Sequence, residues 1–136
     1  MMKEVLQRTA FVSSAAIALL LAWTTGAYAH HSFAATYNST GEVLEIEGTV
    51  REMVWRNPHS FIRVDVTDDN GETQTWALEW GSISQLQESN LTRTTLRPGD
   101  TVIAKGDPAR DASAPRLLLR ELRRPSDGWE WIGRVR

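Results

Sequence analysis

The stretch HSFIRVDVTDDNGETQTWALEW, residues 59–80, decides the fold of this chain. Apolar and polar side chains alternate at its start, and Ile62, Val64 and Val66 all fall on one face. This two-residue period is typical of a strand with one buried face. Asp-Asp-Asn-Gly at 68–71 then predicts a tight turn, because Asn-Gly accepts the positive φ angles that a two-residue hairpin requires. The stretch therefore predicts two antiparallel strands joined by a hairpin.

Working outward, the alternation continues on both sides of this turn. Residues 72–80 form the third predicted strand, and its inward face is aromatic and aliphatic, with Trp76, Leu78 and Trp80. Residues 42–55 form the first, with Leu44, Ile46, Gly48 and Val50 on one face. Gly48 inside that run predicts a bulge or a sharp bend. Asn57-Pro58 ends the run, so the second strand covers 59–67.

The remaining chain supplies a helix and two or three further strands. Ser82 is a good N-cap, and Gln85 three residues later predicts a capping box and a short helix to about Asn90. Further strands are expected at 101–105, 117–122 and, as a short extra strand, 129–132. Three strands, a helix and two strands follow one another in that order in the OB-fold. The fold class expected is all-β, a small OB-fold-like barrel of five or six strands with one short helix between strands three and four.

The first 29 residues read as a secretory signal peptide. Lys3 and Arg8 flank the start, an apolar run covers 11–23, and Ala-Tyr-Ala at 27–29 is a small-x-small cleavage site. The run is shorter than the roughly 20 apolar residues of a spanning helix. The alternative is an uncleaved membrane anchor. The predicted organisation is thus signal peptide 1–29, lead-in segment 30–41 and OB-like barrel domain 42–136. A periplasmic or secreted location follows, with no stable membrane span after cleavage.

Composition excludes several functional classes. Hydrophobic residues make up 41% and charged residues 24% of the chain, a balance typical of globular domains. The formal net charge is −2, so there is no basic field for nucleic acid. There are no cysteines, which excludes disulfides and thiolate metal sites. No catalytic triad, phosphate loop or zinc-protease helix is readable, so a binding role is favoured over catalysis.

Several short motifs together resemble a family of small exported bacterial proteins of uncharacterised function. The matching segments are His30-His31-Ser32-Phe33-Ala34, Gly48-Thr49-Val50, Val54-Trp55-Arg56-Asn57-Pro58-His59, Asp69-Asn70-Gly71, Trp76-Ala77-Leu78-Glu79 and Leu96-Arg97-Pro98-Gly99-Asp100-Thr101-Val102. The likeness runs from His30 to about Arg124. It implies an OB-type strand order, and it brings no established activity with it.

The histidines suggest a metal site at the new N-terminus. Cleavage after Ala29 makes His30 the first residue, so its α-amine and its own imidazole can chelate one cation. A second imidazole, for which His59 is the candidate, completes a planar three-nitrogen set that favours Cu(II). The arrangement resembles the copper histidine brace of lytic polysaccharide monooxygenases and of some periplasmic copper carriers, and His30 alone carries that likeness.

Other interpretations of the same histidines stay open. His31 is a competing ligand, since the amine, the amide of His31 and its ring could hold copper without His59. Glu79 or Asp65 could add an oxygen. Equally, His30 and His31 could simply follow a cleavage site, and His59 could be a structural residue of the Asn57-Pro58-His59 turn.

The alternative function is an OB-type binding module for a protein or saccharide partner, without metal. Four aromatic residues are candidate ligand-binding side chains, because strands two and three of OB-folds bind ligands by stacking: Trp55, Phe61, Trp76 and Trp80. The competing explanation is that these rings fill the core. A basic cluster on and after strand five offers a weaker possibility, contact with anionic head groups or an acidic periplasmic partner, against a solvated face paired with Glu121: Arg116, Arg120, Arg123 and Arg124.

Overall fold

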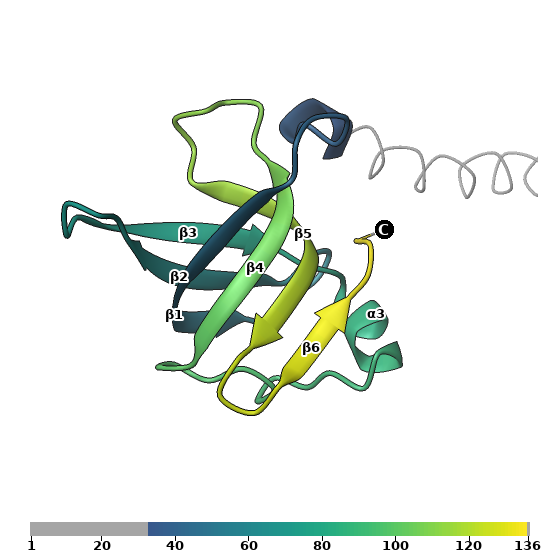
Figure 1. Ribbon diagram of the computed structural model, residues 1–136. Helices are drawn as coiled ribbons and strands as arrows, with labels where there is room; N and C mark the ends of the chain where they lie inside the picture. The colour runs from purple at the N-terminus through teal and green to yellow at the C-terminus, as the bar shows by residue number, and fades with distance from the viewer. Residues whose placement is uncertain (1–32, 136) are drawn as a thin grey trace, which may run out of the picture. The chain divides into compact units, whose positions relative to one another are not determined.

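A computed structural model describes residues 33–135 of the chain. The predicted signal peptide, His30 and His31 lie outside these residues. The compact unit that contains the barrel begins at Ala34. Its elements, in chain order (Figure 1), are β1 Leu44–Val54, β2 Phe61–Thr67, β3 Thr73–Glu79, α3 Ile83–Glu88, β4 Thr101–Pro108, β5 Arg116–Arg124 and β6 Trp129–Ile132.

The strands close into a barrel. They are hydrogen-bonded in the order β3-β2-β1-β4-β5-β6, and β3 also pairs with β5. This extra pairing is parallel and short, joining Ala77–Glu79 to residues 116–118 of β5. Five strands thus form the barrel, and β6 extends it as an antiparallel neighbour of β5. The prediction of an all-β, OB-like barrel with a short helix between strands three and four is confirmed.

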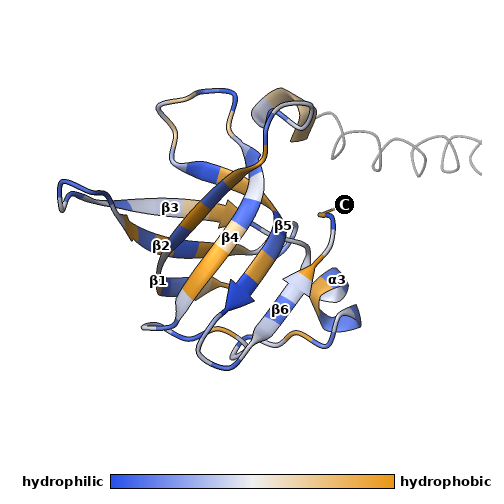
Figure 2. Cartoon of the chain, in the orientation of Figure 1, coloured by the Kyte–Doolittle hydropathy of each residue, from blue (hydrophilic) through white to orange (hydrophobic). Residues whose placement is uncertain are grey.

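The core lies inside this barrel and follows the predicted alternation. Orange and blue residues alternate along the strands in Figure 2. Ile62 and Val64 of β2 and Leu78 of β3 are fully buried. Trp80, just after β3, is also fully buried and packs edge-on against Trp131, with ring centroids 5.2 Å apart. Burial of side chains of this size supplies most of the favourable free energy in a small domain without disulfides.

Gly48 has a different role from the one expected. The register shift in β1 lies between Val50 and Glu52, not at Gly48. A Cβ at Gly48 would come within 2.4 Å of the carbonyl oxygen of Asp65 in β2. The glycine therefore permits close approach of two strands, and the irregularity follows two residues later.

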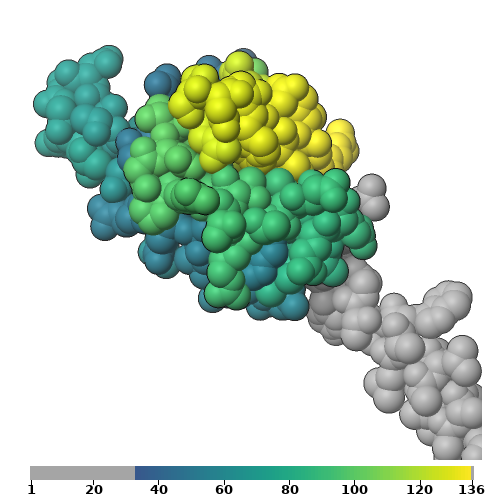
Figure 3. Space-filling view, turned by 90° about the horizontal axis from the view of Figure 1, so that it is seen from below, coloured from purple at the N-terminus to yellow at the C-terminus, as the bar shows by residue number. Residues whose placement is uncertain are grey.

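The predicted capping box of α3 forms only in part: the contact of Ser82 is present, and the contact of the Gln85 side chain is not. Ser82 Oγ accepts a hydrogen bond from the backbone N–H of Gln85 at 3.3 Å. The Gln85 side chain, expected to complete a capping box, instead donates to the carbonyl of Arg134 at 2.9 Å. The helix ends at Glu88 rather than Asn90. Gln85 thereby ties α3 to the C-terminal segment, drawn in yellow in Figure 3.

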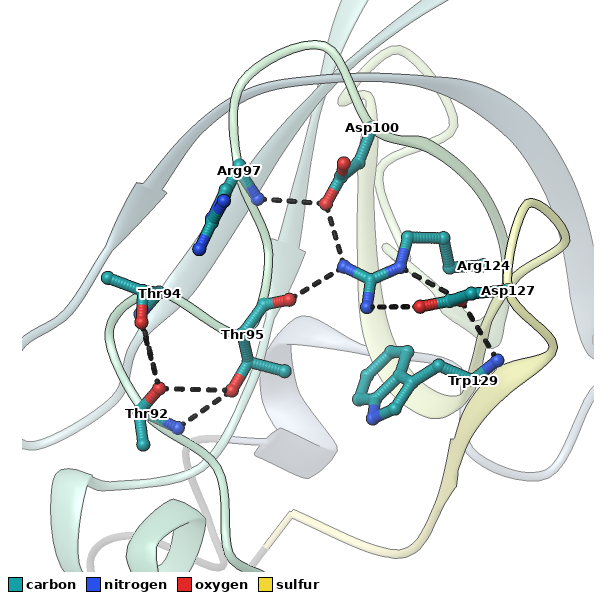
Figure 4. A network of polar contacts seen from close by, with 8 residues as sticks. All are labelled: Thr92, Thr94, Thr95, Arg97, Asp100, Arg124, Asp127 and Trp129. Atoms are coloured by element: carbon teal, nitrogen blue, oxygen red, sulfur yellow. Dashed lines mark hydrogen bonds and ion pairs between the residues drawn. The ribbon is translucent and has the colours of Figure 1, made fainter.

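Arg124, at the end of β5, joins two turns at one end of the barrel (Figure 4). Its Nη1 donates to the Thr95 carbonyl at 2.7 Å and to Asp100 Oδ2 at 2.9 Å. Its Nη2 donates to Asp127 Oδ2 at 2.9 Å, and the guanidinium lies 5.5 Å from the centre of the Trp129 ring. The Arg-Pro-Gly-Asp turn at 97–100 is therefore fixed to the final hairpin by a largely buried cation.

Between residues 33 and 135 there is no helix with the length and apolar content needed to cross a bilayer.

Candidate functional site

His59 stands at the end of a tightly held loop between β1 and β2. The Asn57-Pro58 peptide bond is cis. Asn57 Oδ1 accepts from the backbone N–H of Ile83 at 3.0 Å, which connects the loop to the start of α3. Ser60 Oγ accepts from the Arg56 N–H at 3.3 Å and donates to the Arg56 carbonyl at 3.1 Å. Because both sides of His59 are anchored, its backbone is held in one place.

The imidazole of His59 meets a buried carboxylate. Its Nδ1 lies 2.9 Å from Glu79 Oε1, and the His59 side chain is only 15% exposed. An ionised carboxylate only accepts hydrogen bonds, so Nδ1 carries the proton of this contact. In a neutral ring the other nitrogen, Nε2, is then the one that has the lone pair for a metal.

Glu79 collects donors from three separate parts of the chain. Its Oε1 faces His59, while Oε2 accepts from the Tyr37 hydroxyl and, at 3.1 Å, from Arg116 Nη2. The residue is only 7% exposed. A buried carboxylate is costly unless its charge and lone pairs are matched, and Arg116 together with the two hydrogen bonds matches them.

The Tyr37 hydroxyl keeps its proton and donates it in a hydrogen bond to Glu79. Burial of the phenol raises the pKa of Tyr37 well above its ordinary value, and the hydrogen bond to Glu79 raises it further. The hydroxyl therefore keeps its proton at any physiological pH. The Arg116 guanidinium lies 5.7 Å from the centre of the Tyr37 ring, which places a cation over the aromatic face.

The lead-in segment is fixed to the barrel along residues 34–39. Tyr37 pairs with Ala109 as an antiparallel bridge, and Asn38 N–H donates to the Pro108 carbonyl at 2.9 Å. Further on, Arg120 Nη2 donates to the Ser39 carbonyl at 3.2 Å. The segment before β1 is therefore part of the folded unit, and its Tyr37 reaches Glu79 at the end of β3.

The four arginines on and after strand five are all paired with carboxylates. Arg116 bonds to Glu79, and Arg120 bonds to the buried Asp107 at 2.8 Å. Arg123 pairs with Glu121, as one sequence interpretation expected, and Arg124 with Asp100 and Asp127. Two of them hold the lead-in segment, so the cluster serves the fold of the molecule and its charge is balanced locally.

The four candidate aromatic residues do not form one binding face. Trp80 belongs to the core, and Phe61 lies half-buried on the outer face between Arg56 and Arg116, at 5.1 and 5.9 Å. Trp76 borders a hollow of about 560 Å³ whose wall also includes Val43 and Leu44. Trp55 borders a different hollow, of about 430 Å³. A single stacking platform is therefore not assembled.

The carboxylates considered as oxygen ligands are occupied by protein partners. Asp65 Oδ1 accepts from Thr75 at 2.7 Å and from Arg51 at 3.0 Å. It lies four residues beyond Phe61 along β2, a rise of about 13 Å. Within residues 33–135, no three histidine, aspartate or glutamate side chains come together in a way that could hold a metal ion. A three-ligand site of such side chains that includes His59 would therefore need ligands from outside these residues.

Sequence reasoning found His59 but missed its surroundings. Tyr37 was not among the candidate site residues, and Glu79 was considered only as an extra oxygen ligand. One signal was present: Trp76-Ala77-Leu78-Glu79-Trp80 is almost entirely apolar. A run of this kind indicates that both faces of the strand are covered, so a carboxylate within it needs buried partners.

Comparison with known proteins identifies a family. A family model described as a family of unknown function (DUF6152) matches residues 17–117. No curated protein matches the chain.

Proposed function

We propose, from the premise that the chain belongs to the family of unknown function DUF6152, that it is an exported copper-binding protein. His30 would supply its α-amine and imidazole, and His59 a second imidazole. The role that suits a small barrel without a readable catalytic site is carriage, buffering or delivery of copper, with a periplasmic protein as the partner that gives or receives it.

One observation carries the proposal: Tyr37 and His59 bind the same carboxylate, Glu79. Tyr37 is only seven residues after His30. A segment of that length spans at most about 25 Å when fully extended. A chain end created by cleavage after Ala29 is therefore tethered within reach of His59, although the two residues are far apart in the sequence.

The donor set suits Cu(II). An α-amine has a reference pKa of about 7.7–8.0, so a metal can displace its proton at neutral pH. The amine and ring of one residue form a chelate, and the His59 ring adds a third nitrogen. Nitrogen donors in a planar arrangement favour Cu(II) over harder cations. His31 is the alternative partner, through its amide and its own ring.

The experiment is a Cu(II) titration of exported, processed protein and of the same protein with its α-amine acetylated. Acetylation converts the amine into an amide without supplying a new amine, so we expect the affinity to fall by at least the roughly 10–100-fold that loss of a ligand's outer partner typically costs. His59→Ala should have a similar effect, while His31→Ala should have little. Equal affinity in the free and acetylated forms contradicts the proposal. A loss with His31→Ala and not with His59→Ala assigns the metal to the first two residues alone.

A second candidate is a metal-free binding module for a saccharide or protein. The hollow beside Trp76 favours it, because Val43 and Leu44 in its wall are 43% and 38% exposed, unusual for large apolar side chains. It predicts that tryptophan fluorescence responds to a panel of oligosaccharides or peptides, that Trp76→Ala abolishes the response, and that chelators change nothing. A response that requires copper would argue against this candidate.

A further inference from the structure

We infer that Glu79 is the positioning residue of the proposed metal site. It fixes the ring of His59 with the proton on Nδ1, so that Nε2 is the coordinating nitrogen. The presence of a metal at His59, on which this inference depends, is part of the proposed function. The orientation and tautomer of the ring rest on contacts among residues 37, 59, 79 and 116.

The two carboxylate oxygens of Glu79 have different partners. Oε2 takes both other donors, the Tyr37 hydroxyl and Arg116 Nη2. Oε1 faces Nδ1 of His59, at 2.9 Å. The opposite tautomer would place the Nδ1 lone pair against a carboxylate oxygen, and two acceptors repel one another. The contact therefore selects the form in which Nδ1 is protonated.

Glu79 itself has little freedom to move. It projects from β3 beside the parallel pairing with β5, and it is only 7% exposed. Donors reach it from the lead-in segment and from β5, two elements distant in sequence from β3. A carboxylate held on two sides can impose its direction on a third partner, which a solvated carboxylate cannot do.

The chemical consequence is a stronger nitrogen donor. A histidine that donates its second ring N–H to a carboxylate has a fixed ring orientation and a more basic coordinating nitrogen. Removal of such an outer partner typically reduces metal affinity by about 10–100-fold without removing a ligand. We therefore expect Glu79 to set the affinity of the proposed site, although it does not touch the ion.

The first test determines the tautomer of the His59 ring in metal-free, exported and processed protein labelled with ¹⁵N. Long-range ¹⁵N–¹H correlation spectra should show His59 with a protonated Nδ1 and an unprotonated Nε2. Glu79→Leu should shift the ring toward the Nε2–H form. The matched control is Asp107→Asn, which removes another buried carboxylate that is paired with an arginine of β5, Arg120. His59 should keep its tautomer in that control. The same His59 tautomer in folded Glu79→Leu as in wild type overturns the inference.

The second test measures Cu(II) affinity in the same proteins. Glu79→Leu should weaken binding by about 10–100-fold, and Asp107→Asn by less than about threefold. If Glu79→Leu does not fold, Glu79→Gln replaces it, because its amide oxygen can still accept the ring N–H without the charge. Glu79→Gln should keep the tautomer and show an intermediate affinity. Wild-type affinity in Glu79→Gln and in Asp107→Asn alike contradicts the inference.

The two proposals fail in different ways. Absence of copper binding in wild type, together with the expected tautomer, contradicts the proposed function and leaves the assignment of Glu79 as the residue that orients His59. Copper binding together with a His59 tautomer that does not change in Glu79→Leu overturns the positioning role and leaves the proposed function intact.

Discussion

At the scale of single residues, Glu79 shows how a charge is accommodated in an otherwise apolar strand. Its neighbours Leu78 and Trp80 point inward and are fully buried, while Glu79 points to the outer face. There Tyr37 and Arg116 cover it and supply donors. Because the lead-in segment provides part of this cover, the outer face is buried at this point, and burial makes each donor matter energetically.

Removal of the Tyr37 hydroxyl tests how much its hydrogen bond to Glu79 contributes to stability. Tyr37→Phe keeps the buried ring and removes one donor from Glu79, which retains Arg116 and His59. We expect the free energy of unfolding to fall by about 1–2 kcal/mol, the cost of one lost hydrogen bond to a buried charge. Urea denaturation measures it. Tyr37→Leu, which also loses the ring, should cost more; equal stability of Tyr37→Phe and wild type would show that the hydroxyl contributes nothing.

The site could be predicted only in part, and the reason is the range of its contacts. His59 stands out in the sequence because Asn57-Pro58 precedes it and few histidines compete with it. Its partner lies 20 residues away on another strand, and Tyr37 lies 42 residues from Glu79. Periodicity tells which face a side chain occupies, and it does not tell which distant segment covers that face.

At the scale of elements, the lead-in segment is the least obvious part of the fold. Its sequence has no strand or helix period. It is nevertheless hydrogen-bonded to the outer side of the barrel at several residues. These contacts involve the β4–β5 region and β5 itself: Pro108, Ala109, Arg110 and Arg120.

Truncation tests whether this segment is part of the folded unit. A chain that begins at residue 42 loses Tyr37 and leaves Glu79 buried with fewer donors. We expect it to lose about 3–5 kcal/mol of stability, or not to fold, because a large buried ring and a charge partner are both removed. A chain that begins at Phe33 should melt within a few degrees of the processed protein. Equal thermal stability of the two truncated chains would contradict an integral lead-in.

The Arg124 network gives a second test at the level of elements (Figure 4). Arg124→Ala leaves Asp100, Asp127 and the Thr95 carbonyl without their common donor, and we expect a loss of about 1–3 kcal/mol. Its neighbour Arg123 is the matched control, since it is 40% exposed and pairs with partly exposed carboxylates. Arg123→Ala should cost no more than about 1 kcal/mol. Similar losses in the two variants, measured by urea denaturation, would argue against a special role for Arg124.

At the scale of the whole molecule, the local sequence patterns predicted the order of the strands along the chain, but they did not predict the closure of the barrel. The Asn-Gly turn at 70–71 and the alternation on either side predicted the β2–β3 hairpin correctly. The parallel contact between β3 and β5 has no local sequence pattern, because Ala77 and Arg116 are far apart in the sequence and pair only in the closed barrel. The OB analogy supplied that closure, and the paired segments confirm it.

Acid should destabilise the whole domain. Hydrogen bonds from Arg124 hold the pKa of Asp127 below its ordinary value of 3.8, and those from Thr75 and Arg51 do the same for Asp65. A carboxyl with a lowered pKa in the folded state stabilises it fully above the unfolded value, and this contribution is lost as the pH falls through the folded value. The urea midpoint should therefore decrease below about pH 4. Asp127→Asn should flatten part of that slope, and a midpoint that does not change from pH 5 to pH 2.5 would contradict the assignment.

The most direct measurement of the central claim is a crystal structure of the exported, processed protein grown with stoichiometric Cu(II). The account predicts one copper ion bound by the α-amine and the ring of His30 and by Nε2 of His59, with Nδ1 of His59 still on Glu79. A copper ion held only by His30 and His31, or no bound copper with the His30 and His59 rings too far apart to share an ion, would contradict it.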